Sequence, residues 1–256
     1  MTEYKILVGD CVATMNDAEK IAPASVDHII TDPPYEIGFM GNGWDNSGVA
    51  YNPDTWRAAH KVLKPDGLML VFGATRTHHR IAHAIERADF EILDVWSWCY
   101  GTGFPKSHNI SKTLRKKGHE AEAELWEGYG TALKPAWEPI IVARKKGSSA
   151  TAPLHQFFYI PKAAKSERSI GLPEGMVNTH PTVKPIALME ALTTLVSQNA
   201  GEWILDPFMG SGSTGVAVLS QDRKFIGCEL TADYIPIARP RLSHAIEKIQ
   251  IGSNTQ

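Results

Sequence analysis

Short apolar runs alternate with helical segments along most of this chain, and the alternation limits the folds open to it. The apolar runs are rich in β-branched and aromatic residues and lie at residues 4–8, 26–30, 68–72, 91–100, 202–205 and 224–228. Segments with helical spacing lie at residues 11–21, 53–63, 76–88, 186–197, 214–219 and 232–248. Strands that alternate with helices form mostly parallel sheets with helices on both faces. We therefore expect an α/β protein with a doubly wound, mostly parallel sheet.

The alternation breaks at residue 101 and returns only at Pro185. Residues 101–175 combine a basic helical segment (109–117), an acidic one (121–127), an apolar run (139–144) and proline-rich connections. Residues 105–168 carry 12 Lys and Arg against 6 acids, or +6, which leaves 14 against 22, or −8, for the other residues. A region that contacts a polyanion shows such asymmetry, as does a solvated surface patch. We expect one domain, 1–256, with 101–175 inserted into it.

Composition and cysteine usage indicate the class of protein. With 256 residues, of which 43% are hydrophobic and 21% charged, the chain can bury one large core. Cys11, Cys99 and Cys228 are far apart and form no CxxC pair, so we expect reduced thiols and no metal site. The sequence has neither a secretory leader nor an apolar run near the ~20 residues that span a bilayer. We expect a cytoplasmic protein without a membrane partner.

An acid and two prolines follow the second apolar run. Asp32-Pro33-Pro34-Tyr35 comes one residue after the run at 26–30, where an open α/β sheet binds ligands at the carboxyl ends of its strands. Proline has no N–H, so the Pro33 carbonyl and the Asp32 carboxylate can both present acceptors beside the Tyr35 ring. Two acceptors next to a stacking surface suit a planar ring that carries an NH2 group, such as a nucleobase. An Asp-Pro turn beside a buried tyrosine is the structural alternative.

A glycine-rich turn follows the run at 202–205 and opens a helical segment. Its glycines have the spacing of a dinucleotide fingerprint and are Gly210, Gly212 and Gly215. Glu229, at the end of the next run, can hold ribose hydroxyls, and this pattern alone allows an NAD-dependent oxidoreductase. Asp206 and Phe208 favour another adenosyl ligand, because they can meet a cationic amino group and an adenine ring or sulfonium. S-adenosylmethionine carries all these groups, and we expect it as the cofactor.

Both motifs, in this order, resemble those of the amino-type DNA methyltransferases, which act on the exocyclic amine of adenine or cytosine. The order resembles the permuted β group of that family, and the segments 101–107 and 137–140 resemble its phage and prophage members. Further matching segments are Gly9-Asp10, His180-Pro181-Thr182-Val183-Lys184-Pro185 and Arg223-Lys224-Phe225-Ile226-Gly227-Cys228-Glu229. The resemblance implies the seven-stranded, Rossmann-like sheet of S-adenosylmethionine-dependent methyltransferases.

The resemblance also implies a role for each matching residue. The catalytic residues would be Asp32, Pro33, Pro34 and Tyr35. The cofactor would contact Asp10, Thr182, Lys184, Asp206, Phe208, Gly210, Ser211, Gly212 and Glu229. Within this set, Asp10 would hold the adenine amine, Glu229 the ribose, and Thr182 with Lys184 the carboxylate. On the residues alone, Asp10 can also cap a helix and Lys184 can start one.

The expected reaction is methyl transfer from S-adenosylmethionine to the N6 amine of adenine in DNA. Asp32 and the Pro33 carbonyl would accept the two amine hydrogens and localise the nitrogen lone pair. The base would leave the duplex and stack on Tyr35. By association with the family, an acid at the first position favours adenine over the N4 amine of cytosine. An NAD-dependent oxidoreductase and a non-catalytic DNA-binding protein are the alternatives from other classes.

Residues 101–175 are the expected region of DNA contact and target recognition. The residues expected to contact the phosphates of double-stranded DNA are Lys106, Lys112, Arg115, Lys116, Lys145 and Lys146. Binding through them should weaken steeply with salt. The resemblance further allows a homodimer and a cognate restriction endonuclease as partners.

Overall fold

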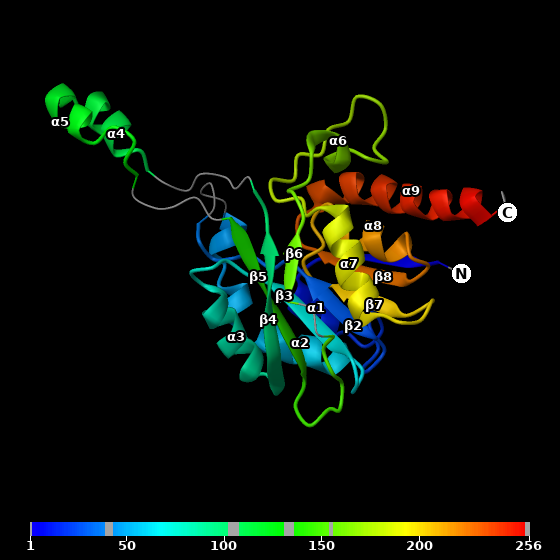
Figure 1. Cartoon of the computed structure of the whole chain (residues 1–256). Helices are drawn as coiled ribbons and strands as arrows, with labels where there is room; N and C mark the ends of the chain where they lie inside the picture. The colour runs from blue at the N-terminus through cyan, green and yellow to red at the C-terminus, as the bar shows by residue number, and fades with distance from the viewer. Residues whose placement is uncertain (1, 39–42, 102–107, 131–135, 154–155, 254–256) are drawn as a thin grey trace.

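An eight-stranded sheet forms the centre of the molecule in this computed structural model (Figure 1). The structure describes residues 2–38, 43–101, 108–130, 136–153 and 156–253. Within these residues the strands are β1 (Tyr4–Val8), β2 (His28–Thr31), β3 (Leu68–Phe72), β4 (Phe90–Cys99), β5 (Trp137–Lys145), β6 (Phe157–Tyr159), β7 (Trp203–Asp206) and β8 (Lys224–Glu229). The predicted count of seven is one short, because the three-residue β6 is too short to show any periodicity in the sequence.

The strand order is β1-β8-β7-β2-β3-β5-β4-β6, and every strand except β5 runs in the same direction. β5 lies antiparallel between β3 and β4, where Leu70 pairs with Val142 and Val95 with Ile141. The segment 101–175 therefore supplies a strand inside the sheet. The carboxyl ends of the parallel strands share one edge, and the reversed β5 brings its first residue, Trp137, to that same edge beside Cys99.

Helices cover the sheet on both faces (Figure 1). Alternate side chains of each strand enter opposite layers, so Ile29 packs in the layer under α1, α2 and α3, while Ile30 packs with α7, α8 and α9. The helices are α1 (Cys11–Asn16), α2 (Pro53–Val62), α3 (His78–Glu86), α4 (Ile110–Lys116), α5 (Glu120–Leu125), α6 (Lys165–Arg168), α7 (Ile186–Val196), α8 (Ser213–Leu219) and α9 (Ile235–Ser253). This arrangement is the predicted doubly wound fold.

Helix α1 is shorter than the 11–21 segment predicted for it. It ends at Asn16, and Asp17 takes an extended backbone whose N–H bonds back to the carbonyls of Ala13 and Thr14. Three short 3-10 turns also occur, at Gly43–Asn46, Val49–Tyr51 and Ala232–Tyr234. No described helix is both long enough and apolar enough to cross a bilayer.

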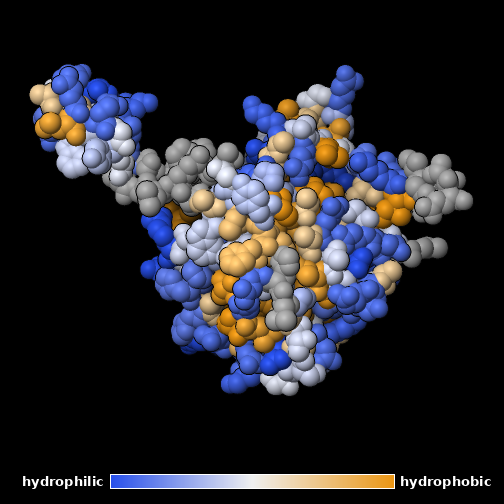
Figure 2. All heavy atoms as spheres, in the orientation of Figure 1, coloured by the Kyte–Doolittle hydropathy of each residue, from blue (hydrophilic) through white to orange (hydrophobic). Residues whose placement is uncertain are grey.

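Two parts of the segment 101–175 differ in how they meet the sheet. Helices α4 and α5 form a hairpin that lies away from the sheet (Figure 1), with Asn109 capping α4 and Arg115 paired to Glu127 at 2.8 Å. Strand β6, in contrast, lies at the edge of the sheet. Figure 2 shows apolar side chains gathered over β4 and β6, where Val95 and Phe157 are 38% and 68% exposed.

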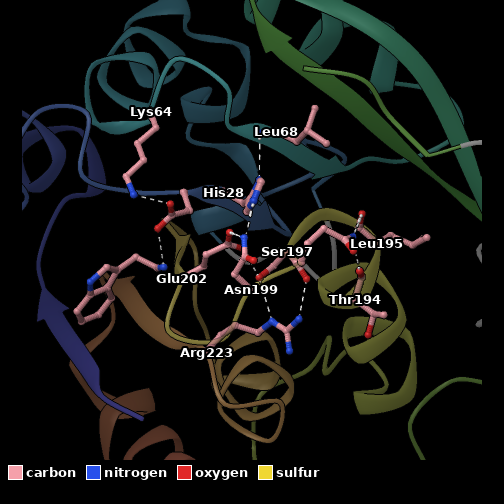
Figure 3. A network of polar contacts seen from close by, with 12 residues as sticks. His28, Lys64, Leu68, Thr194, Leu195, Ser197, Asn199, Glu202 and Arg223 are labelled. Atoms are coloured by element: carbon pink, nitrogen blue, oxygen red, sulfur yellow. Dashed lines mark hydrogen bonds and ion pairs between the residues drawn. The ribbon is translucent and has the colours of Figure 1, made fainter. Parts of the chain in front are cut away.

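A polar network connects the amino-terminal ends of two strands, on the side of the sheet opposite the carboxyl ends (Figure 3). Asp27, which precedes β2, accepts hydrogen bonds from Lys64 Nζ at 2.5 Å and from the Trp203 N–H at 2.8 Å. Glu202, which precedes β7, accepts from Ser197 Oγ at 2.6 Å. These bonds tie the beginning of β2 to the beginning of β7.

Candidate active site

One cleft of about 1260 Å³ lies at the carboxyl edge of the sheet and contains both sequence motifs. β2 leads into Asp32 and β7 ends in Asp206, and these strands are neighbours in which Ile29 pairs with Leu205. The predicted site residues that line the cleft are Asp10, Asp32, Pro33, Pro34, Tyr35, Thr182, Lys184, Asp206, Phe208, Gly210, Ser211 and Glu229. Gly212 lies at the start of α8, where its φ of 81° suits a residue without a side chain.

Asp32 stands beside a lysine. The Lys184 ammonium donates a hydrogen bond to Asp32 Oδ2. Asp32 Oδ1 is buried and has no hydrogen-bond partner among the residues that the structure describes. Burial raises the pKa of Asp32, and the positive charge of Lys184 opposes that rise. The carboxylate therefore has one oxygen engaged by an ammonium and one oxygen left for a donor from outside the chain.

Lys184 lies at the catalytic motif, where it bonds Asp32; its expected role toward the cofactor's carboxylate stays a prediction. Its Nζ lies 5.1 Å from the ring centroid of Phe72, 5.4 Å from that of Tyr35 and 5.9 Å from that of Trp98. Burial opposes the positive charge, but the carboxylates of Asp32 and Glu138 outweigh it and raise the pKa of Lys184. The ammonium is thus held in an aromatic cage between two acids.

Glu138 is a site residue that the sequence analysis missed. Its Oε1 accepts hydrogen bonds from Lys162 Nζ at 2.8 Å and from the Tyr100 hydroxyl at 3.1 Å, and its Oε2 accepts from the Tyr35 hydroxyl at 2.8 Å. Burial opposes its ionisation, but the ammonium groups of Lys184 and Lys162 outweigh burial and hold the pKa of Glu138 at about 2. The available signals were an acid at the head of an apolar run and the resemblance of residues 137–140 to members of the family.

Tyr35 is fixed at both its ring and its backbone. The hydroxyl donates to Glu138, and the Tyr35 carbonyl accepts from the Tyr51 hydroxyl at 3.2 Å and from Thr77 Oγ1 at 3.0 Å. The ring therefore presents a preset face to the cleft. A preset aromatic face loses little side-chain entropy when a planar ligand stacks on it.

Asp206 serves the protein's own structure. It is 2% exposed; its Oδ1 accepts from Thr31 Oγ1 at 2.6 Å and from the Phe208 N–H at 3.0 Å, and its Oδ2 accepts from Thr214 Oγ1 at 2.6 Å. Burial raises its pKa to about 6. Both oxygens are engaged inside the fold, so Asp206 shapes the turn; its role toward a ligand's amino group stays a prediction, since Oδ2 has a second acceptor site and Asp206 lines the cleft.

Two carboxylates border the glycine-rich turn from neighbouring strands. Glu229 at the end of β8 accepts from the Gly210 N–H at 2.8 Å and from the Thr231 N–H at 2.7 Å. Asp10, just after β1, accepts from the Ala13 N–H at 2.8 Å and so caps α1 while lining the cleft. A carboxylate oxygen has two acceptor sites, so both groups can still receive hydrogen bonds from a ligand.

The glycine-rich turn is packed from both sides. A Cβ added to Gly210 would lie 2.6 Å from His180 Nε2, and the buried Arg241 donates to the Ser211 carbonyl at 2.6 Å. Thr182 contributes its N–H, which donates to His180 Nδ1 at 3.4 Å. Burial lowers the pKa of His180 to about 4, so the ring is neutral at pH 7.

The predicted DNA-contact residues do not form one surface. Lys112, Arg115 and Lys116 lie exposed on α4, although Arg115 is paired within the hairpin. Lys145 and Lys146 lie at the amino-terminal edge of the sheet, opposite the cleft, because β5 runs antiparallel and Lys145 pairs with Phe90 at the start of β4. Their assignment to the same interface is therefore corrected. Lys106 lies outside the described residues.

Comparisons with known proteins show the family of this chain. Residues 26–240 match the family model N6_N4_Mtase, described as DNA methylase. The chain is 31% identical to the Type II methyltransferase M2.DpnII of Streptococcus pneumoniae, over 90% of this chain and 87% of that protein. It is 30% identical to the Type II methyltransferase M2.LlaDCHI of Lactococcus lactis subsp. cremoris, over 88% and 85%.

A solved structure shows the same architecture. The crystal structure of the M1.HpyAVI–SAM complex superposes with a TM-score of 0.63 and 26% sequence identity, and the match covers 93% of this chain and 98% of that one. The residues that match the family model, 26–240, include both the Asp32-Pro33-Pro34-Tyr35 tetrad and the glycine-rich turn that line the cleft. The chain therefore belongs to the amino-type DNA methyltransferases and is an S-adenosylmethionine-dependent DNA methyltransferase.

Proposed function

We propose that this enzyme methylates the N6 amine of adenine in DNA and that Asp32 is the residue that receives the amine. The observation that carries the proposal is the buried Oδ1 of Asp32, which has no partner among the described residues and belongs to a residue that lines the cleft. The ionised carboxylate of an aspartate accepts hydrogen bonds, and an exocyclic amine has two hydrogens to donate. The Asp32-Pro33-Pro34-Tyr35 tetrad favours adenine over cytosine by its likeness to the family.

The residues around the turn fit S-adenosylmethionine. Glu229 and Asp10 offer acceptors for ribose hydroxyls and for an adenine amine, Phe208 offers an apolar face, and Gly210 leaves the turn without a side chain. When bound, S-adenosylmethionine supplies the methyl group carried on its sulfonium. Thr182 lines the same part of the cleft through the backbone that contacts His180.

The chain's own contribution to the reaction is orientation and proton acceptance. The amine nitrogen is a poor nucleophile because its lone pair is delocalised into the ring. Hydrogen bonds to Asp32 Oδ1 and to the Pro33 carbonyl draw the nitrogen toward tetrahedral geometry and stabilise the positive charge that develops on it. As the N–C bond forms and the C–S bond breaks, the amine loses one proton, for which Asp32 is the adjacent acceptor. Tyr35 stacks on the base in place of its neighbours in the duplex.

The remaining assignments concern partners. Exposed Lys112 and Lys116 on α4 are the residues we assign to the phosphates of double-stranded DNA. The Type II methyltransferase names of the relatives support a role in restriction and modification, with a cognate endonuclease as partner. Light scattering of the purified protein tests whether it forms the homodimer that the resemblance allows.

The test is to incubate the protein with S-adenosylmethionine and unmodified DNA, digest the DNA to nucleosides, and identify methylated species by mass spectrometry. N6-methyl-2′-deoxyadenosine, absent with Asp32→Ala, is the expected product. N4-methylcytosine would overturn the choice of base and retain the chemistry. Absence of both, with the cofactor shown to bind by calorimetry, would overturn DNA amine methylation under these conditions.

A further inference from the structure

Lys184 lies beside Asp32 and Tyr35, the two residues that we assign to the target base. Its ammonium bonds Asp32, lies among the rings of Tyr35, Phe72 and Trp98, and its side chain is 9% exposed in a cleft that Lys184 itself lines. No prediction from the sequence gave it a role toward the base. An enzyme that only needed to ionise Asp32 would not have to hold the cation within the aromatic pocket that receives the ring.

The ammonium has donors to spare. It carries three N–H groups, and among the residues that the structure describes it donates a hydrogen bond to Asp32 alone. Glu138 Oε2 is 3.7 Å away, close enough for charge attraction and too long for a hydrogen bond. Aromatic faces attract a cation but leave its N–H groups available for an acceptor.

Asp32 and Lys184 together form an acceptor beside a donor. Adenine presents the complement: its N6 amine donates, and the neighbouring ring nitrogen N1 accepts. Cytosine presents the same pair at N4 and N3. Guanine carries a hydrogen on N1, which would face the ammonium with a donor against a donor, and thymine carries no exocyclic amine. On the Watson–Crick edge, by which enzymes read a flipped base, the pair is therefore complementary to adenine and cytosine and not to guanine or thymine.

We propose that Lys184 is a specificity-determining residue that donates a hydrogen bond to the ring nitrogen next to the target amine. The inference rests on the proposed function, since it needs an amino-bearing base in the cleft. The ammonium keeps its hydrogen bond to Asp32 Oδ2, and the ring nitrogen accepts from one of its other N–H groups. Glu138 positions the aromatic cage, because it accepts a hydrogen bond from the Tyr35 hydroxyl at 2.8 Å, and Lys162 donates in turn to Glu138.

The experiment uses two synthetic duplexes that contain the methylated sequence, once sequencing of methylated DNA has identified it. The target adenine is replaced by 1-deazaadenine, which lacks the N1 acceptor, or by 7-deazaadenine, which keeps it. For the wild-type enzyme, kcat/KM should be about ten- to hundredfold lower on the 1-deaza duplex, the loss typical of one hydrogen bond to a charged group. If the modified base proves to be cytosine, 3-deazacytosine takes the place of 1-deazaadenine and cytosine itself is the reference.

The same pair of duplexes is then given to two variants. In Lys184→Met the ratio between the duplexes should fall to within about twofold, whatever the variant's overall rate. Lys64→Met, which removes the lysine beside Asp27 at the opposite edge, should keep the wild-type ratio. An unchanged ratio in Lys184→Met, or equal rates for the two duplexes with the wild-type enzyme, overturns the proposal.

Two outcomes are kept apart by design. If unmodified adenine and cytosine are not methylated at all, the proposed function fails before this test begins. If they are methylated and the deaza ratio is flat, only the role of Lys184 fails. Should Lys184→Met not fold, judged by its circular dichroism, the wild-type ratio alone decides, since it needs no variant.

Discussion

An aspartate–lysine pair lies at each end of strand β2, and the two pairs differ in how many oxygens of the aspartate have a hydrogen-bond partner. Before the strand, Asp27 engages Lys64 with one oxygen and the Trp203 N–H with the other. After the strand, Asp32 engages Lys184 with one oxygen and leaves the other buried without a partner in the described part of the chain. Lys64 is 45% exposed, whereas Lys184 is 9% exposed.

The difference separates structure from chemistry. At the amino edge, each recorded bond of Asp27 and Glu202 ends on another residue of the network, so removing one group costs stability (Figure 3). At the carboxyl edge a buried acceptor is kept without a partner, which folding alone would disfavour. Asp32 also lines the cleft, where a ligand can complete it, and matched substitutions at the two edges test that distinction.

The largest contrast is expected between Asp32→Ala and Asp27→Ala. Asp32→Ala should lower kcat by at least about 10²–10³-fold, because it removes the acceptor for the developing charge, while the dissociation constant of S-adenosylmethionine changes by less than about threefold. Asp27→Ala should leave kcat within about twofold and lower the free energy of unfolding by about 1–3 kcal/mol. Methylation assays, calorimetry and urea unfolding measure these effects; transfer by Asp32→Ala would remove the catalytic assignment.

The second contrast concerns pH and His180. Its pKa is about 4 in the fold against 6.5 for an ordinary histidine, so the unfolded chain binds more protons between those values and stability falls as pH is lowered. Between pH 7 and pH 5 this costs about 2 kcal/mol. His180→Gln should lose that dependence. Asp206 has a pKa raised to about 6, so its contribution to the stability of the fold increases as the pH falls over the same range. Because both proteins keep Asp206, the difference between wild type and variant in urea unfolding isolates the effect of His180.

The third contrast compares two glutamates. Glu138→Gln should lower kcat/KM by about tenfold, because a neutral amide holds Lys184 and the Tyr35 hydroxyl less strongly than a carboxylate does. Glu202→Gln, in the network at the opposite edge, should change kcat/KM by less than about twofold. Equal effects of the two substitutions would mean that the cluster around Glu138 is only structural.

The smallest contrast concerns DNA affinity. Replacing Lys112 and Lys116 with alanine should weaken DNA binding several-fold and lower the slope of log K against log salt by about one per lysine. Replacing Lys145 and Lys146 should leave the slope unchanged, because they lie at the edge away from the cleft. Fluorescence anisotropy across a salt series measures both pairs, and a changed slope for the second pair would place DNA at the amino edge.

The sequence predicted the features that follow from residues close together in the chain. Strand and helix periodicity predicted the doubly wound sheet, and the residues after two strands predicted that Asp32 and the glycine-rich turn would share one edge. That prediction works because the carboxyl ends of parallel strands meet wherever those strands lie in the sheet.

What the sequence left open depends on direction and neighbourhood. Nothing in the apolar run at 139–144 indicates that β5 is antiparallel, and this reversal sends Lys145 away from the cleft while bringing Glu138 into it. Glu138 meets Tyr35 across 103 positions of sequence, so no spacing rule relates them. Lys184 was assigned by motif, whereas its contacts follow from where α7 begins relative to β2 and β3.

The hydrogen bond between Thr31 and Asp206 links the two sequence motifs directly. Thr31 immediately precedes the acceptor of the amine, and Asp206 begins the turn that borders the methyl donor's site; their side chains meet at 2.6 Å across 175 positions. In-line transfer tolerates little error in the separation of donor and acceptor atoms. This buried hydrogen bond adds to the pairing of β2 with β7, so the separation of the two motifs depends on the sheet, and connecting loops can differ in sequence without changing it.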